Sequence, residues 1–262
     1  MKKIIYVGLA LATIAIGCKQ ETKTTSLVGA HKLDKQVITD GKTETVKTAA
    51  NGDIQYKIYT PEGYFYIALS KDSSGGFGIG SYTQTGNVVT ESNIYNSISL
   101  DTASSVKLDI TAAEKGYTQV IPEITVSGTK YKFTEDYTTV STTGTSALDG
   151  IWHQTKSIDV KNGKDTVVGT YNEYKVYNAG HFMWATKFTD TATKKVSNFA
   201  GHGTFTLNND ALTEQLDISN VKGAMGKYNI KLKFNGADEY TQETADTTAK
   251  TVNFKTYKRI KK

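Results

Sequence analysis

Four histidines, His31, His153, His181 and His202, are the side chains best suited to acid–base or metal chemistry in this sequence. None of them stands in a His-Glu-x-x-His motif or in another spacing that gathers metal ligands on one element. If a hairpin turns near Ala192-Thr193, His181 and His202 lie diagonally on one face of it and within reach of each other. Two imidazoles are too few for a stable zinc site. We therefore expect no metal and no cofactor.

The serines and glycines form no catalytic or phosphate-binding motif. No serine stands in a Gly-x-Ser-x-Gly elbow, and no histidine can be assigned an aspartate that would orient it. Gly75, Gly76, Gly78 and Gly80 miss the Gly-x-Gly-x-x-Gly pattern, and no helix follows them. They indicate a hairpin turn and close-packed strand positions instead. Without an acid, a base and a nucleophile, the sequence predicts no enzyme.

The only cysteine, Cys18, follows a segment typical of exported proteins. A positive start, Met1-Lys2-Lys3, leads into an apolar run over 4–16 that is too short to span a bilayer comfortably as a helix. This predicts a signal peptide over 1–17. The small residues before Cys18 resemble a bacterial lipobox, with Ala15 in place of the commoner leucine, and this resemblance implies lipid attachment to Cys18. The alternative is an ordinary signal peptide with an incidental cysteine.

A polar segment, 18–26, follows and is typical of a tether. Several acyl chains would hold the protein on a membrane. Lysines and acids directly after Cys18 resemble the surface-export signals of Bacteroidota lipoproteins. We therefore expect an outer-membrane lipoprotein in the cell envelope, with the periplasmic face and the cell surface both left open.

A repeat in the sequence identifies the elements that must position these residues. Two tandem copies, 27–140 and 148–262, are joined by a linker over 141–147. The expected superposition places Gly63 on Gly180, Gly80 on Gly203 and Glu91 on Glu214. The matched segments are 55–59 with 173–177, 63–68 with 180–185, 78–83 with 201–206, and 88–91 with 211–214.

Each copy contains about eight short alternating runs separated by tight turns, with no sustained helical periodicity. Abundant tyrosine, threonine and valine, with only two prolines in 262 residues, favour pleated strands. The predicted fold is all-β, with two tandem antiparallel up-and-down barrels of about eight strands each, closed so that no sheet edge remains. The formal net charge of +5 is spread diffusely, so we expect no nucleic-acid partner.

The second copy resembles a lipocalin-like domain. Its opening, Leu148-x-Gly150-x-Trp152, is similar to that of calycins, and its later runs resemble the lipocalin-like domains of Bacteroidota lipoproteins. In lipocalins a tryptophan plugs the closed end of the barrel and a late arginine stacks on it. The resemblance assigns this role to Trp152 and Arg259, the only arginine, whereas the first copy has His31 in place of the tryptophan. It implies a barrel that binds an apolar small molecule and assigns no reaction.

Aromatic hairpins supply the candidate ligand-binding residues Phe65, Tyr66, Phe182, Met183 and Trp184. Along a strand, Phe182 and Trp184 point to one side and Met183 to the other. The rings either line a cavity or fill the barrel, since eight strands permit both. The sequence predicts a lipid-anchored envelope protein that binds a small apolar ligand, chiefly in the second copy. The alternative is a structural or assembly lipoprotein that binds an envelope protein partner through the outer barrel surfaces.

Overall fold

The computed structural model describes residues 25–70, 75–97, 105–161, 164–167, 172–190, 192–246 and 250–261. The predicted signal peptide, Cys18 and most of the predicted tether lie outside the described residues. In the described ranges, no helix is long and apolar enough to cross a membrane.

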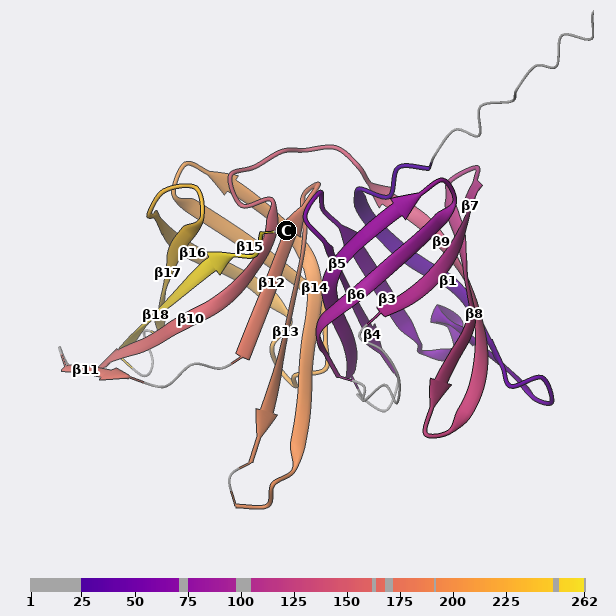
Figure 1. Ribbon diagram of the computed structural model, residues 1–262. Coiled ribbons are helices and arrows are strands. Elements are labelled where there is room, and N and C mark those ends of the chain that lie inside the picture. The colour runs from indigo at the N-terminus through magenta and orange to yellow at the C-terminus, as the bar shows by residue number, and fades with distance from the viewer. Residues whose placement is uncertain are drawn as a thin grey trace, which may run out of the picture.

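The first half of the chain forms a closed antiparallel barrel (Figure 1). Eight strands follow one another around the barrel, and β1 closes it by pairing with β9 as well as with β3. The remaining strand, β2, forms a short arm on the outer half of β1. The elements are β1 (Gly29–Thr39), β2 (Glu44–Thr48), η1 (Ala49–Asn51), β3 (Ile54–Tyr59), β4 (Tyr64–Leu69), β5 (Gly75–Thr85), β6 (Val88–Asn96), β7 (Ser105–Ala113), β8 (Gly116–Val126) and β9 (Thr129–Ser141).

The second half repeats this topology, with β10 pairing with both β12 and β18 and with β11 as the arm. The two predicted antiparallel barrels in tandem are therefore confirmed. The strands are β10 (Gly150–Lys161), β11 (Lys164–Val167), β12 (Asn172–Asn178), β13 (His181–Thr189), β14 (Val196–Asn208), β15 (Ala211–Ser219), β16 (Gly226–Phe234), β17 (Glu239–Asp246) and β18 (Thr251–Arg259).

A glycine stands at the same bulge in both barrels. The pairing register shifts just before Gly80 between β5 and β6, and just before Gly203 between β14 and β15. A Cβ atom at Gly80 would overlap the carbonyl oxygen of Ser92, and one at Gly203 would overlap that of Gln215. Only glycine allows this backbone approach. The two glycines therefore correspond, as the repeat predicts.

The hairpins that precede these bulges correct one detail of the expected superposition. Tyr64 and Phe182 each pair with the bulge glycine of their own barrel, so they occupy corresponding positions. Matching Gly63 with Gly180 is therefore wrong by one residue. A slip of one residue moves each side chain to the opposite face of the sheet. The predicted match therefore exchanged the inner and outer faces of β4, whereas the match of 55–59 with 173–177 keeps β3 in register.

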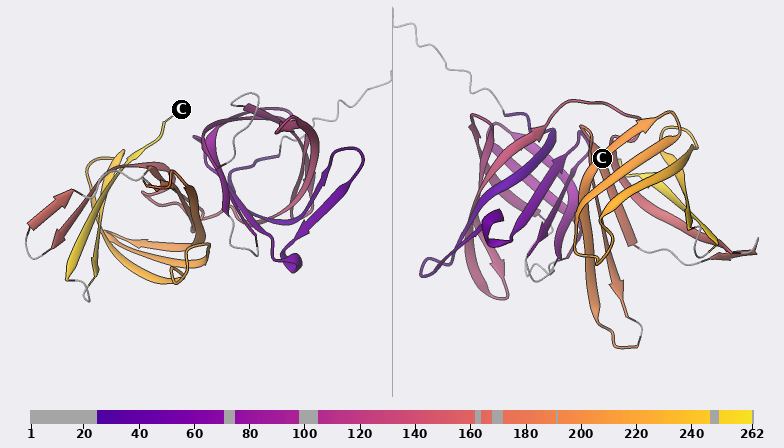
Figure 2. Two further views of the ribbon diagram at one scale, coloured as in Figure 1. Left: turned by 90° about the horizontal axis from the view of Figure 1, so that it is seen from below. Right: turned by 180° about the vertical axis from the view of Figure 1, so that it is seen from behind.

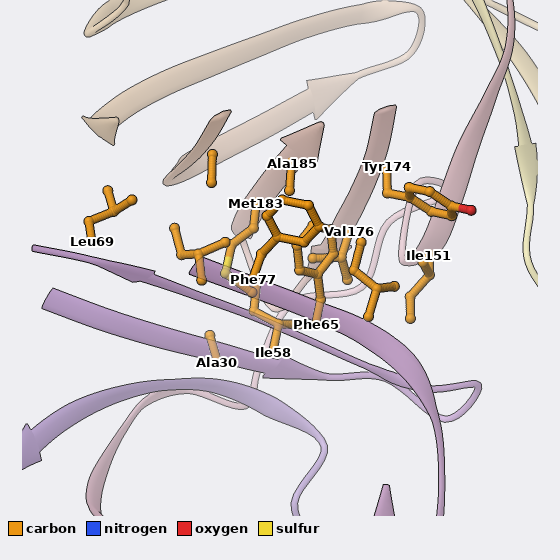
Figure 3. Packing of buried hydrophobic residues seen from close by; sticks show 13 residues of the cluster. Ala30, Ile58, Phe65, Leu69, Phe77, Ile151, Tyr174, Val176, Met183 and Ala185 are labelled. Carbon is orange, nitrogen blue, oxygen red and sulfur yellow. The ribbon is translucent and has the colours of Figure 1, made fainter. Parts of the chain in front are cut away.

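The two barrels pack side by side (Figure 2). Outward-facing residues of β3–β5 meet those of β12–β14 in a buried apolar core between the barrels (Figure 3). Asn178 adds a polar contact, donating from Nδ2 to the carbonyl oxygen of Tyr59 at 2.6 Å. A hydrophobic interface of this kind opposes independent motion of two domains. The core consists of Ala30, Ile58, Phe65, Ile67, Leu69, Phe77 and Ile79 from the first barrel, and Ile151, Tyr174, Val176, Met183, Ala185 and Ala200 from the second.

Candidate functional site

The second barrel holds a cavity of about 660 Å³ that opens to solvent. One part of its wall is apolar and includes the rings of Phe182 and Trp184, which project inward from β13. The opposite part is polar and charged. The described lining residues are Phe182, Trp184, Leu216, Ala224, Tyr228, Ile230, Ala245, Asp159, Glu173, Lys175, Glu214, Gln242, Thr244, Thr251, Asn253 and Lys255.

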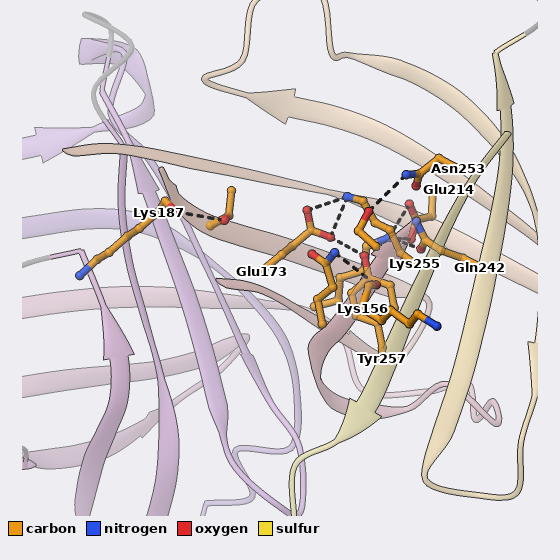
Figure 4. A network of polar contacts seen from close by, with 12 residues as sticks. Lys156, Glu173, Lys187, Glu214, Gln242, Asn253, Lys255 and Tyr257 are labelled. Atoms are coloured by element: carbon orange, nitrogen blue, oxygen red, sulfur yellow. Dashed lines mark hydrogen bonds and ion pairs between the residues drawn. The ribbon is translucent and has the colours of Figure 1, made fainter. Parts of the chain in front are cut away.

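A buried ion pair joins β12 to β15 at the cavity (Figure 4). Nζ of Lys175 lies 2.8 Å from Oε1 of Glu214 and donates to Oε1 of Gln242 at 3.2 Å. The Tyr177 hydroxyl donates to the same Glu214 oxygen at 2.5 Å. Both charged side chains are less than a tenth exposed. Such charges are tolerated inside a barrel because each is paired and hydrogen-bonded.

A second ion pair links β12 to β18. Nζ of Lys255 lies 3.1 Å from Oε2 of Glu173, and the Tyr257 hydroxyl donates to the same carboxylate. Burial alone would raise the pKa of Glu173, but the positive charges of Lys255 and Lys175, together with the hydrogen bonds from Tyr257 and Lys255, hold that pKa below its ordinary value. Glu173 is therefore ionised at neutral pH.

A third carboxylate, that of Asp159, faces the cavity from β10, the strand that closes the barrel by pairing with β18. Its Oδ1 accepts a hydrogen bond of 2.7 Å from Nδ2 of Asn253, its cross-strand partner on β18. The Asn253 amide also donates to Oγ of Ser157 at 3.3 Å. A neutral amide thus holds the carboxylate in place without neutralising its charge.

The five predicted ligand-binding residues are placed in three different environments. Phe182 and Trp184 line the cavity of the second barrel. Tyr66 packs on the interior core of the first barrel. Phe65 and Met183 point out of their barrels into the core between them (Figure 3), so the expectation that these two line a ligand cavity is wrong. The physical reason is the strand alternation, which sends neighbouring side chains to opposite faces.

At one end of the second barrel, Arg259 lies over Trp152, in the geometry that the resemblance implies. The guanidinium carbon is 4.2 Å from the centroid of the buried indole. The indole Nε1 donates to the carbonyl oxygen of Leu148 at 2.7 Å, and the guanidinium donates to the carbonyl oxygens of Ala147 and Asp149. The guanidinium thereby links β18, the last strand of this barrel, to the segment that leads into β10, its first strand.

The predicted neighbours His181 and His202 meet at the interface between the barrels. Their Nδ1 and Nε2 atoms are 3.3 Å apart, and the ring of Tyr56 from the first barrel stacks on His202 with centroids 3.7 Å apart. Burial, then the charges of His181 and Lys32, lowers the pKa of His202 to about 3. Among the described residues, no group of three or more His, Cys, Asp or Glu side chains could hold a metal ion.

The charged residues of the cavity were missed by the sequence reasoning, although the repeat carries a signal for some of them. Lys57 and Glu91 stand at the positions of Lys175 and Glu214, and they form a buried ion pair of the same length, 2.8 Å. A charged residue repeated at an inward-facing strand position in both copies would have indicated an interior network. No such signal exists for Asp159, because the first copy has Ile38 there.

Comparisons with known proteins supply no family. No protein-family model matches the sequence, and no curated protein matches it. A solved structure of isotype 1 transferrin binding protein B from serogroup B Neisseria meningitidis aligns at 11% identity and a TM-score of 0.22, over 83% of this chain and 65% of that one. Kievitone hydratase from Nectria haematococca aligns at 10% and 0.21, over 92% and 91%. The chain thus spans just under two thirds of the transferrin binding protein, and neither likeness carries a functional argument.

Proposed function

We propose that this protein is a binding protein of the bacterial cell envelope whose second barrel takes up one small molecule with an apolar body. The cavity of about 660 Å³ carries the proposal. Its volume falls within the range of about 300–1,000 Å³ that is usual for small-molecule sites, and such sites combine apolar walls with a few placed polar groups. The cavity of the second barrel has both features.

The second barrel is favoured over the first by the residues at matched wall positions. Thr244 and Asn253 line the cavity, whereas the first barrel has Ile121 and Phe133 at these positions. Both of those side chains pack on the interior core of the first barrel. Replacing the polar pair by the apolar pair should therefore plug the cavity with residues that the fold already accommodates.

The test is native mass spectrometry of the mature protein purified from its own envelope. We expect a co-purifying small molecule on the wild type and none on the Thr244→Ile/Asn253→Phe variant. A cooperative thermal melt must show that this variant is folded, because Asn253→Phe also removes the hydrogen bond to Asp159. The control is Thr241→Ile/Thr256→Phe, which adds the same side chains to the outer face of the same two strands, where the two threonines are hydrogen-bonded to each other. A bound molecule that survives the plugged variant would place the binding site elsewhere.

The envelope location rests on the sequence alone and has its own test. Lipid on Cys18 would hold the barrels at the outer membrane, because several acyl chains give stable anchoring. We expect Cys18→Ser to release the protein into the soluble fraction, and protease treatment of intact cells to distinguish the cell surface from the periplasmic face. A variant that stays with membranes after a salt wash would contradict lipid anchoring through this residue.

A further inference from the structure

We infer that the ligand of the second barrel carries a positively charged group, such as a protonated amine, that binds against Asp159. The inference rests on the proposed binding function of the cavity and names the chemical class of its ligand. It follows from the balance of charges around the cavity, from the contacts that the Asp159 carboxylate makes, and from a difference between the two barrels.

The charged groups lining the cavity do not balance. The described lining residues include three carboxylates, of Asp159, Glu173 and Glu214, but only two ammonium groups, of Lys175 and Lys255. Each lysine already has a carboxylate partner, at 2.8 Å for Lys175 and 3.1 Å for Lys255. The described lining therefore carries one net negative charge.

Asp159 is the source of that excess charge. Among the residues that the structure describes, no lysine or arginine forms an ion pair with it. Its carboxylate accepts a hydrogen bond from the neutral amide of Asn253. An anion that is held in place but not neutralised, on the wall of a half-buried site, attracts a cation more strongly than it would in water. A ligand carboxylate would instead meet like charge.

The aromatic part of the wall favours the same ligand class. Phe182, Trp184 and Tyr228 present rings to the cavity. The face of an aromatic ring attracts an ammonium group and also packs against an apolar body. The cavity therefore offers both parts of a cationic amphiphile a matching surface.

The Asp159–Asn253 pair is a feature of the second barrel and not of the fold. The cross-strand pair at the corresponding positions of the first barrel is Ile38 with Phe133. The interior ion pair of the two barrels, by contrast, is the same in both copies. The first barrel also holds a carboxylate that only neutral groups contact, Glu135, but amides and a hydroxyl enclose it. Asp159, by contrast, lines a cavity that a ligand can enter, which is the pattern expected of a ligand contact.

Three probes of one shape and different charge test the inference: phenylbutylamine, phenylbutanol and phenylbutyrate. Binding is followed at neutral pH by the fluorescence of Trp184, with Trp184→Phe identifying its signal against that of Trp152, which is fully buried away from the cavity. We expect the amine to bind about tenfold more tightly than the alcohol, which is the order expected of one partly desolvated charge pair. The carboxylate should bind most weakly.

Asp159→Asn should lower the affinity for the amine to that for the alcohol and leave the affinity for the alcohol unchanged. The matched control, Asp109→Asn, removes the same charge from an exposed position on β7 of the first barrel and should change none of the affinities. An alcohol that binds as tightly as the amine, or an amine preference that survives Asp159→Asn, would overturn the inference alone. If the alcohol and the amine both fail to bind, the proposed binding function fails, and the inference with it.

Discussion

In both barrels a lysine reaches into the interior and pairs with a glutamate from a strand across the barrel. Lys57 pairs with Glu91 and Lys175 with Glu214, each at 2.8 Å. A glutamine accepts a further hydrogen bond from each lysine. The barrels differ in the groups that surround this shared pair, and the difference separates what the fold needs from what a ligand site needs.

The first barrel holds a second interior carboxylate, Glu135, with neutral donors only. It is 4% exposed and accepts hydrogen bonds from the amides of Gln36, Gln55 and Gln119 and from the hydroxyl of Tyr137. Amides are large enough to fill the space around the carboxylate. Among the described residues, the buried lysines and glutamates of this interior are one lysine, Lys57, and two glutamates, Glu91 and Glu135.

At the positions that correspond to Glu135 and Gln36, the second barrel has an oppositely charged residue and a smaller one. Lys255 stands where the first barrel has Glu135, and Ser157 stands where it has Gln36. Glu173 then pairs with Lys255 instead of bonding to an amide. The comparison teaches that the central lysine–glutamate pair belongs to the architecture. The groups around it differ between an interior in which amides surround the second carboxylate and an interior that lines a cavity.

The largest expected effect tests the shared ion pair. Lys57→Met leaves Glu91 and Glu135 buried without a cation, so we expect it to lower the free energy of unfolding by roughly 3–5 kcal/mol. Lys175→Met should cost less, because its partner Glu214 lines the cavity and can be solvated there. Urea denaturation at neutral pH measures both. In the double variant Lys57→Met/Glu91→Gln, part of the loss should be recovered, and an equal cost for the two lysines would refute the proposed difference.

The closed ends of the barrels differ in a way that pH can reveal. His31 in the first barrel and Trp152 in the second each bond through a ring nitrogen to a backbone carbonyl oxygen, of Leu27 and of Leu148, both at 2.7 Å. Burial lowers the pKa of His31 to about 4, an effect that the bond to Leu27 opposes and the charge of nearby Lys57 reinforces. Trp152 does not titrate. Of these two rings, only that of His31 can therefore respond to acid.

We expect the stability contributed by His31 to be complete above pH 6.5, the ordinary pKa of histidine, and to be lost as the pH falls towards about 4. A depressed pKa means that the unfolded chain binds the proton first, so acid favours unfolding. The difference between 6.5 and about 4 corresponds to roughly 3 kcal/mol. Unfolding free energies of the wild type and of His31→Phe across this range measure it. Identical pH profiles would show that protonation of His31 does not destabilise the fold.

The architecture could be predicted from the sequence because its determinants are local and repeated. Gly80 and Gly203 mark the same bulge, and the repeat locates both. The contact between Arg259 and Trp152 was also within reach, since closure of a barrel joins its first and last strands. In these cases, the known pairing of strands and the residue type at each position are enough to predict the contact.

The interface between the barrels could not be predicted in the same way. Strand alternation separates two faces but does not say which face is inside, and both faces of β4 and β13 are buried. Phe65 and Met183 are as apolar as the residues that line a cavity, yet they face the other barrel. The Asp159 site was missed for a related reason. From the sequence alone, an acidic residue in a strand is predicted to face solvent, and only the packing around it shows otherwise.

The smallest expected effect tests the contact that distinguishes the closed end of the second barrel. Arg259 and its counterpart Thr139 pair with Trp152 and His31, respectively. Arg259 stacks on its partner and bonds to carbonyl oxygens of the preceding segment, whereas Thr139 makes one hydrogen bond of 3.1 Å to its histidine. A guanidinium is planar and weakly hydrated, so lysine cannot reproduce the stack.

We therefore expect Arg259→Lys to lose about 0.5–2 kcal/mol, the usual contribution of a cation–π contact, and Arg259→Ala somewhat more. The matched change in the first barrel, Thr139→Ala, removes a single hydrogen bond that is only partly buried, so it should lower the melting temperature less than Arg259→Ala does. Thermal melts at neutral pH compare the three variants. If Arg259→Lys and Arg259→Ala both melt at the wild-type temperature, the stacked pair does not hold this end of the barrel closed, and the difference between the two closed ends is one of shape alone.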